Sequence, residues 1–197
     1  MPESEYWIMH FDRSKMKEGA GAGVVLKYPK GDVMEYVLQI HFNASNNVAE
    51  YEALLHGLHI AKEIGVKRIL CYGDSDLVQH QLNQTWDAKN PIMAEYRRTV
   101  DEFAICFFGF EVLHVKREEN WNADALARMG SERVTTLPPG VFVQHLHEPS
   151  IKGGDVDYPL ISESIEVMLV NPNWKIPYLN FLVDQKFSDG ADEVLQR

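Results

Sequence analysis

The most constraining feature of the sequence is a helical pattern between Asn47 and Ile64. Its apolar side chains recur every three or four residues, which places them along one face of an α-helix. Gly65 follows as a stop signal. The pattern therefore predicts a helix whose apolar stripe faces a sheet, and the stripe consists of Val48, Tyr51, Leu54, Leu55, Leu58, Ala61 and Ile64.

Short apolar runs bounded by turn residues predict strands on both sides of this helix. The first is Tyr6–Phe11, and a hairpin follows in which residues 20–28 and 33–40 flank a turn at 29–32. Later in the chain we expect strands at 68–72 and 110–115 and helices at about 76–82, 90–105 and 121–129. A hairpin continued by helix crossovers predicts an α/β fold with a five-stranded mixed sheet and helices on both faces.

The composition of the chain changes near residue 136. Of nine prolines, six lie at or beyond Pro138, so we expect a domain boundary between residues 131 and 140. Residues 5–130 would form the domain, and residues 131–197 an irregular, partly disordered C-terminal tether. Within this tether the patterns allow strands at 141–146 and 166–170 and a short helix at 174–183.

The charge of the chain limits how it can bind a partner. Its 197 residues include 19 Lys and Arg and 29 Asp and Glu, a net charge of −10, which argues against nucleic-acid binding through bulk positive charge. An acidic chain can still bind phosphates through metal ions. No apolar run approaches the roughly 20 residues of a membrane span, and the start of the sequence lacks the features of a secretory signal. We therefore expect an intracellular protein without a membrane segment.

Four acids occupy unusual positions. Asp12 and Asp74 each end a predicted strand, Glu50 lies in the first turn of the 47–64 helix, and Asp124 lies early in the last helix. Taken singly, such acids more often start turns or complement helix dipoles. Together they can converge at one end of the sheet, where their mutual repulsion requires hard cations such as Mg²⁺. Two such ions can stabilise the attacking and leaving oxygens of a phosphoryl displacement.

The four acids lie in four ordered segments of the chain. These are Phe11-Asp12-Arg13-Ser14, Ser45-Asn46-Asn47-Val48-Ala49-Glu50, Tyr72-Gly73-Asp74-Ser75 and the stretch from His114 to Asp124. The segments resemble the active-site segments of type I ribonuclease H, and four motifs in this order are far more specific than any one of them. The likeness is greatest to the ribonuclease H domain of plant gypsy-like retrotransposon polyproteins, and it covers about residues 5–130.

The resemblance implies a ribonuclease H-like fold and a role for each matched position. His114 would assist proton transfer and product release, although a histidine at a strand end is otherwise usually structural. Asn46 and Asn47 would contact the hybrid in its minor groove, and Ser45 a DNA phosphate, whereas polar residues before a helix otherwise serve as caps. Two Mg²⁺ ions, with Mn²⁺ as the alternative, would be bound by Asp12, Glu50, Asp74 and Asp124.

Arg13 is the main departure from the family pattern, which has glycine after the first acid. This long cation can contact a phosphate of the scissile strand, displace a metal ion, or simply lie at the surface. The sequence also lacks the lysine- and arginine-rich helix with which some cellular members hold the hybrid. Because Arg97-Arg98 is the only nearby basic pair, we expect weak unaided substrate binding.

Two histidine pairs remain outside these motifs. His56 and His59 share a helical face, and His145 and His147 flank Leu146. Neither pair has the cysteine or acidic partners that a zinc site needs, so we expect all four side chains to face solvent.

Three functions remain in competition. The first is an endonuclease that hydrolyses the RNA strand of RNA/DNA hybrids, leaving a 5′-phosphate and a 3′-hydroxyl. The second is a catalytically decayed nucleic-acid-binding module of retroelement origin, with Arg13 as the sign of decay. The third, ranked last, is a related exonuclease that digests from a terminus. Reverse transcriptase and integrase portions of a polyprotein are the expected protein partners.

Overall fold

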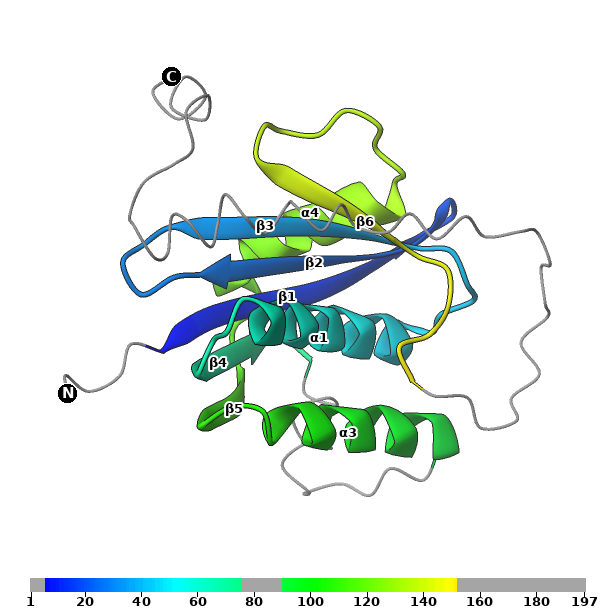
Figure 1. The fold of residues 1–197 in the computed structure, drawn as a ribbon. Helices are drawn as coiled ribbons and strands as arrows, with labels where there is room; N and C mark the ends of the chain where they lie inside the picture. The colour runs from blue at the N-terminus through cyan, green and yellow to red at the C-terminus, as the bar shows by residue number, and fades with distance from the viewer. Residues whose placement is uncertain (1–5, 76–89, 152–197) are drawn as a thin grey trace. The chain divides into compact units, whose positions relative to one another are not determined.

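A computed structural model of the chain describes residues 6–75 and 90–151 (Figure 1). These residues form a six-stranded sheet, three α-helices of 18, 14 and 11 residues and a short 3-10 helix. The strands are β1 (Trp7–Met16), β2 (Gly19–Lys27), β3 (Val33–Ile40), β4 (Arg68–Gly73), β5 (Gly109–His114) and β6 (Val141–Leu146). The helices are α1 (Asn46–Glu63), α3 (Pro91–Ala104), η1 (Arg117–Glu119) and α4 (Trp121–Ser131).

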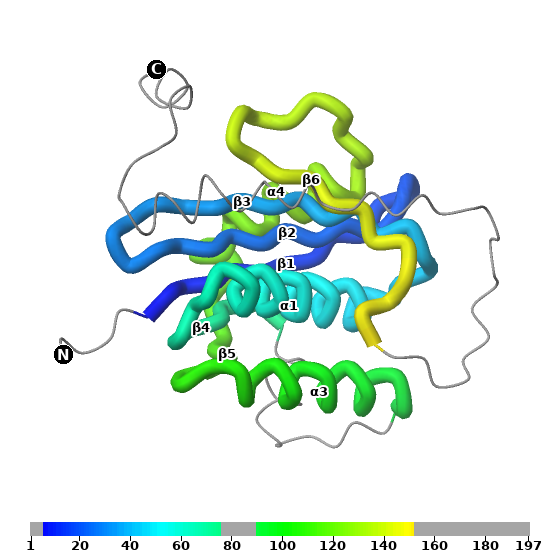
Figure 2. Tube along the Cα trace, in the orientation of Figure 1, coloured from blue at the N-terminus to red at the C-terminus, as the bar shows by residue number. Residues whose placement is uncertain are grey.

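The strands lie in the order β5-β4-β1-β2-β3-β6 (Figure 1). The β1–β2 and β2–β3 pairs are antiparallel, as two successive hairpins require, whereas β4, β5 and β6 join by parallel pairing. The sheet is therefore mixed, as the sequence predicted. Figure 2 shows the same arrangement as a trace, with β6 beside β3 and α3 beyond α1.

Helices cover both faces of the sheet, which confirms the predicted architecture (Figure 1). A Cβ added to Gly23 in β2 would lie 2.2 Å from the carbonyl oxygen of Ala123 in α4. Its neighbour Val24 points to the opposite face, because side chains alternate along a strand. There Val24 contacts the position where Gly57 of α1 would carry a Cβ, at 3.0 Å. Glycine thus lets the α4 backbone lie directly on β2, close to the strand that carries Asp12.

The first strand is longer than the sequence predicted. We expected it to end near Phe11, with Asp12 at the strand end, but β1 continues to Met16 and Asp12 pairs with Gly23 of β2. The reason is tertiary: hairpin pairing with β2 satisfies the backbone of the polar residues that follow Asp12. The parallel pairing with β4, by contrast, ends at His10 and Tyr72. Asp12 therefore lies beyond the point where β4 leaves β1.

The sheet has six strands rather than the predicted five. The sixth, β6, comes from the segment that we assigned to the C-terminal tether, and it pairs with β3 from Glu35↔Val141 to Ile40↔Leu146. An edge formed by β3 alone would leave a row of unpaired backbone groups, which β6 satisfies. The sheet thus extends beyond residue 130.

Several expectations lie outside the described residues. These are the helix at about 76–82, the strand at 166–170 and the helix at 174–183. Among the helices of residues 6–75 and 90–151, none combines the length and the apolar character needed to cross a bilayer.

Candidate metal and nucleic-acid site

Three of the four predicted acids come together. Asp12 lies on β1, Glu50 in the second turn of α1, and Asp74 directly after β4. Each offers a carboxylate oxygen, and these oxygens all lie within 4.8 Å of one another. Carboxylate oxygens are the ligands that hard divalent cations such as Mg²⁺ prefer. The three acids are called the acid group below.

Glu50 is the most unusual member of the acid group. Its side chain is 1% exposed, and within the described part of the chain neither carboxylate oxygen has a hydrogen-bond partner. Burial raises the pKa of Glu50 well above its ordinary value, and the charges of Asp12 and Asp74 raise it further. An ionised carboxylate without hydrogen bonds is among the most costly groups to bury. A bound cation would remove this cost, so the site fits a metal ion.

The surroundings of Asp12 also disfavour its ionised form. It is 4% exposed, and burial followed by the charge of Asp74 raises its pKa from 3.8 to about 7. The backbone N–H of Arg13 donates to its Oδ1 at 2.7 Å and acts in the opposite direction. Since the net shift is upward, the surroundings of Asp12 disfavour its negative charge unless a cation is close.

Asp124, the fourth predicted acid, is not part of the acid group. It lies in the first turn of α4, close enough to Asp12 to contribute to the rise in its pKa. Its oxygens are ion-paired: Arg128 Nη2 lies 2.8 Å from Oδ2, and Arg117 Nη2 lies 3.7 Å from Oδ1. Arg128 is four residues further along the same helix, a spacing at which opposite charges meet. Neither arginine was identified from the sequence, although the spacing of four between Asp124 and Arg128 indicated this ion pair.

Arg13 lies at the edge of the acid group. Its Nε is 3.8 Å from Oε2 of Glu50, and its side chain remains 40% exposed. Its charge lowers the pKa of both Glu50 and Asp12, but in each case other effects are larger. Of the three placements considered for Arg13, the structure therefore favours one beside the acids over an ordinary surface position.

His114 lies near the acid group at the same edge of the sheet. It is the exposed last residue of β5, in register with Gly73 of β4, and Asp74 follows Gly73 directly. The backbone N–H of Val115 donates to the carbonyl of Gly73 at 3.0 Å, which ties the two strand ends together. Adjacent parallel strands thus bring the predicted histidine and one acid to neighbouring positions.

Asn120 fixes the start of α4 to the strand that carries Asp12. This side chain is 1% exposed; its Nδ2 donates to the carbonyl of Phe11 at 3.0 Å, and its Oδ1 is 3.2 Å from Nδ1 of His10. Asn120 thereby determines where Asp124, four residues later, lies relative to Asp12. The sequence carries no local signal for this contact, because it joins positions 109 and 110 residues apart.

The predicted substrate-binding residues lie at the start of α1. Ser45 is its N-cap, and its hydroxyl accepts a hydrogen bond from the backbone N–H of Val48 at 3.2 Å. Asn46 is exposed and Asn47 half-buried, one turn before Glu50. The structural capping role of Ser45 is thus present, and the two asparagines border the acid group from the same helix end.

A second buried acid on α1 contrasts with Glu50. Glu52 is fully buried, but the hydroxyl of Tyr96 and both the backbone N–H and hydroxyl of Ser150 donate to its carboxylate at 2.5–2.7 Å. Glu52 therefore has a structural role: it joins α1 to α3 and to the segment that follows β6. Glu52 was not predicted to be a buried structural acid.

One arginine of the basic pair Arg97-Arg98 on α3 already pairs with acids. Arg98 forms ion pairs with Glu95 and Glu102 of its own helix, the second at 3.4 Å. Carboxylates that already neutralise a guanidinium leave it less available for a phosphate backbone. Weak unaided binding of the substrate stays a prediction.

Comparisons with known proteins give consistent matches. Residues 11–130 match the family described as reverse transcriptase-like. Ribonuclease HI of Halobacterium salinarum is 40% identical over 84 residues, which are 43% of this chain and 42% of that protein. The uncharacterised protein YpeP of Bacillus subtilis is 30% identical over 133 residues, 56% of its length. The chain therefore spans roughly half the length of these curated relatives.

Solved structures share the fold. The crystal structure of RNase H1 from Halobacterium salinarum superimposes with a TM-score of 0.59 and 32% identity, covering 66% of this chain and 99% of that one. LC11-RNase H1, solved in complex with an RNA/DNA hybrid, has a TM-score of 0.58 and 25% identity, with 66% and 99% covered. The architecture is thus that of ribonuclease H.

Proposed function

The chain belongs to the reverse transcriptase-like family, and on that basis we propose that it is a metal-dependent endonuclease that hydrolyses the RNA strand of RNA/DNA hybrids. The ribonuclease H relatives and the fold support this class of activity. One solved relative of the same fold was crystallised with an RNA/DNA hybrid, which supports the substrate.

The observation that carries the proposal is the buried carboxylate of Glu50 within the acid group, whose oxygens accept no hydrogen bond from the described residues. Acids that merely stabilise a fold are hydrogen-bonded, as Glu52 is. Glu50, by contrast, costs the metal-free protein stability, and a divalent cation would remove that cost. A site maintained at such a cost points to metal-dependent chemistry.

The proposed roles follow from position. Asp12, Glu50 and Asp74 hold the metal ions, and Asp124 joins them when its arginine pairs open. Bound Mg²⁺, or Mn²⁺ in its place, supplies activation of water and stabilisation of the charge that develops on the phosphate, with two ions proposed. His114 moves protons at the site edge, and Arg13, 40% exposed, reaches a phosphate of the bound strand. Ser45, Asn46 and Asn47 contact the hybrid from the start of α1.

The test uses a hybrid whose RNA strand carries a label at its 5′ end, with Mg²⁺ or Mn²⁺ present. We expect internal cuts in the RNA strand that leave 5′-phosphate and 3′-hydroxyl ends, and none in single-stranded RNA or duplex DNA. Asp74→Asn should abolish cleavage, because it removes a charge from the acid group. Glu111→Gln, which changes an exposed acid on neighbouring β5, is the matched control and should cut like the native chain.

Three results would contradict this proposal. Absence of metal-dependent cleavage, or equal cleavage by the Asp74→Asn variant, would refute the nuclease reading. Loss of activity on a hybrid with both RNA ends blocked would indicate an exonuclease instead.

The second candidate is a catalytically decayed module that binds nucleic acid without cutting it. The observation that favours it is the cation Arg13 beside Glu50, where the family pattern has glycine. Arg13→Gly separates the two candidates. Cleavage by this variant but not by the native chain would support decay, whereas equal cleavage by both would refute it.

We also infer an origin in a retrotransposon polyprotein, which rests on the resemblance of the four motifs to plant gypsy-like elements. Reverse transcriptase and integrase portions would then be neighbours in a longer chain, and residues 131–197 would include the connector between them. The intracellular location is a proposal of the same kind. Because β6 pairs with β3, we place the end of the folded domain after β6 rather than near residue 130.

A further inference from the structure

Three histidines gather at the β3–β6 edge of the sheet, outside the acid group. His41 directly follows β3, His145 lies in β6, and His147 follows β6. The backbone N–H of His41 donates to the carbonyl of Leu146 at 2.8 Å, which aligns the two strand ends. Since His145 and His147 are two residues apart, they project from the same side of the chain. Parallel pairing of β3 with β6 thus brings together residues about 100 positions apart.

The three rings face one another closely. Nε2 of His41 is 2.8 Å from Nδ1 of His145. The ring of His147 stacks on that of His41 at 4.7 Å with 11° between the planes, and it lies 6.3 Å from the ring of His145. All three side chains are exposed, so an ion can reach them and the rings can rotate. From the sequence alone, His145 and His147 lacked the cysteine or acidic partners of a zinc site, whereas in the structure His41 supplies a third imidazole.

We propose that His41, His145 and His147 form a binding site for a transition-metal ion of the Zn²⁺ class, separate from the acid group. Two imidazole nitrogens on a tetrahedral zinc ion lie about 3.3 Å apart, given Zn–N distances of about 2.0–2.1 Å. The observed 2.8 Å between His41 and His145 needs an opening of about half an ångström. The stacked rings must also rotate until a nitrogen of each points to the same ion, which their exposure allows. Imidazole suits Zn²⁺, Ni²⁺ and Cu²⁺, whereas Mg²⁺ prefers oxygen ligands, so the two sites select different ions.

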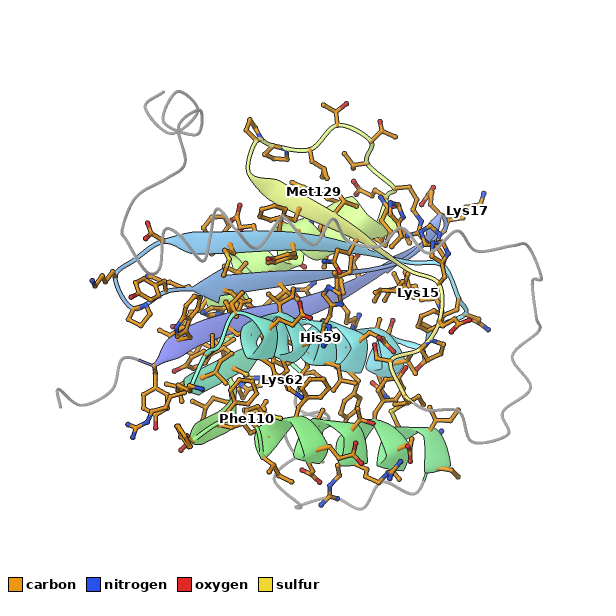
Figure 3. The ribbon with its side chains drawn as sticks, viewed as in Figure 1. Lys15, Lys17, His59, Lys62, Phe110 and Met129 are labelled. Atoms are coloured by element: carbon orange, nitrogen blue, oxygen red, sulfur yellow. The ribbon has the colours of Figure 1, made fainter. Side chains whose placement is uncertain are left out.

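Charged groups around the histidines limit the affinity without preventing binding. Lys15, Glu18 and Arg133 line a hollow of about 420 Å³ that also borders His41; Lys15 lies near the end of β1 (Figure 3). Arg133 donates to the carbonyls of Ile40 and Gly130 at 2.6 and 3.3 Å, which directs its guanidinium toward the backbone. The Lys15 ammonium likewise donates to the carbonyl of Ala44 at 2.9 Å. We therefore expect one ion held by the three histidines, with water in the remaining position.

A metal ion at this site would also join β6 to the rest of the sheet. β6 is an edge strand whose ladder runs along β3 alone among the described strands. An ion bound to residues at the ends of both strands would oppose their separation, since metal bound to the native state adds to its stability. Zn²⁺ should therefore slow hydrogen exchange at the amides of β6.

Isothermal titration of the full chain with Zn²⁺, at pH 7.5 and with Mg²⁺ present throughout, tests the site. We expect one Zn²⁺ per chain, and an affinity at least about tenfold lower in His145→Ala, since even outer-shell changes have effects of that size. His59→Ala is the matched control, because this exposed histidine lies on α1 next to Glu63 (Figure 3). Native-like binding by His145→Ala, or binding lost in Asp74→Asn instead, would overturn the proposal.

A second measurement needs no variant and guards against misfolding. The chain has eight histidines, and the ring resonances of three should shift when Zn²⁺ is added. If the signals of His41, His145 and His147 remain in place, the ion binds elsewhere and the inference is wrong.

Discussion

Removing the charge of Asp12 should stabilise the metal-free protein, although the residue lies at the centre of the proposed metal site. Its carboxyl is 4% exposed and close to Asp74, and its pKa is raised from 3.8 to about 7. Between pH 3.8 and about 7, the folded state therefore holds a proton on Asp12 that the unfolded chain has released. Asp12→Asn retains an acceptor for the backbone N–H of Arg13 but carries no charge.

The magnitude follows from linkage. A folded-state pKa above the unfolded value means that the contribution to stability is fully present below pH 3.8 and is lost as the pH rises through 7. The pKa rises by about three, and each whole pKa step corresponds to ~1.4 kcal/mol. At pH 8 the native protein therefore loses about 4 kcal/mol of unfolding free energy. At pH 5 the corresponding loss is below about 2 kcal/mol. The variant avoids this loss at both pH values.

Urea unfolding in the presence of a chelator measures the effect. At pH 8 we expect Asp12→Asn to exceed the native protein in unfolding free energy by up to about 4 kcal/mol, and by less than half of that at pH 5. Saturating Mg²⁺ should narrow the gap by stabilising only the native protein. If the variant is no more stable than the native chain at pH 8, or if the gap does not depend on pH, the reasoning about the acid group is refuted.

Three further outcomes test separate parts of the structure. Arg13→Gly should tighten Mg²⁺ binding severalfold in calorimetric titration, because it removes a cation 3.8 Å from Glu50, and an unchanged affinity would contradict this. Glu52→Ala should lower the unfolding free energy by about 3 kcal/mol, since it leaves the hydrogen-bonding groups around this buried carboxylate unpaired. Burial lowers the pKa of His56 to about 4, so stability should fall as the pH drops from 6.5 to 4. His56→Gln should remove that part of the pH dependence in urea unfolding, and an identical pH profile would count against it.

Local patterns predicted most of the fold correctly. The expected helix at 47–64 became α1 at 46–63, and β3 has the predicted bounds. Both elements carry strong periodicity or turn signals, which depend only on neighbouring residues. β1 was predicted too short because its second half, Asp12–Met16, is stabilised by pairing with β2 rather than by its own composition.

The burial and the partners of the histidines were also not predictable from local patterns. His56 and His59 were both expected to face solvent, but His56 is 8% exposed. Residues three apart on a helix share a face only approximately, so one can be buried while the other is exposed. His145 acquired a partner in His41, across a parallel pairing that no local pattern predicted.

The candidate site was likewise predicted only in part. The sequence predicted that four acids would converge, and the structure brings three of them together. Asp12 within β1, Glu50 near the start of α1 and Asp74 after the end of β4 meet at one place. The ion pairs of Asp124 depend on side-chain packing. Of the two, only the pair with Arg128, four residues later on the same helix, could have been predicted from the spacing. Glu52 shows why burial cannot be judged from helix spacing alone: its partner Ser150 lies 98 residues away.

The formal net charge of −10 overstates the negative charge of the metal-free protein. It counts every acid as ionised, whereas the pKa of Asp12 is about 7 and that of Glu50 is raised well above its ordinary value. Protons and cations therefore compete for the same oxygens, and a metal that binds must displace protons. The charge that an approaching nucleic acid meets thus depends on what occupies the acid group. An acidic composition consequently argues against binding through bulk positive charge, but it does not exclude binding at a site that a cation has neutralised.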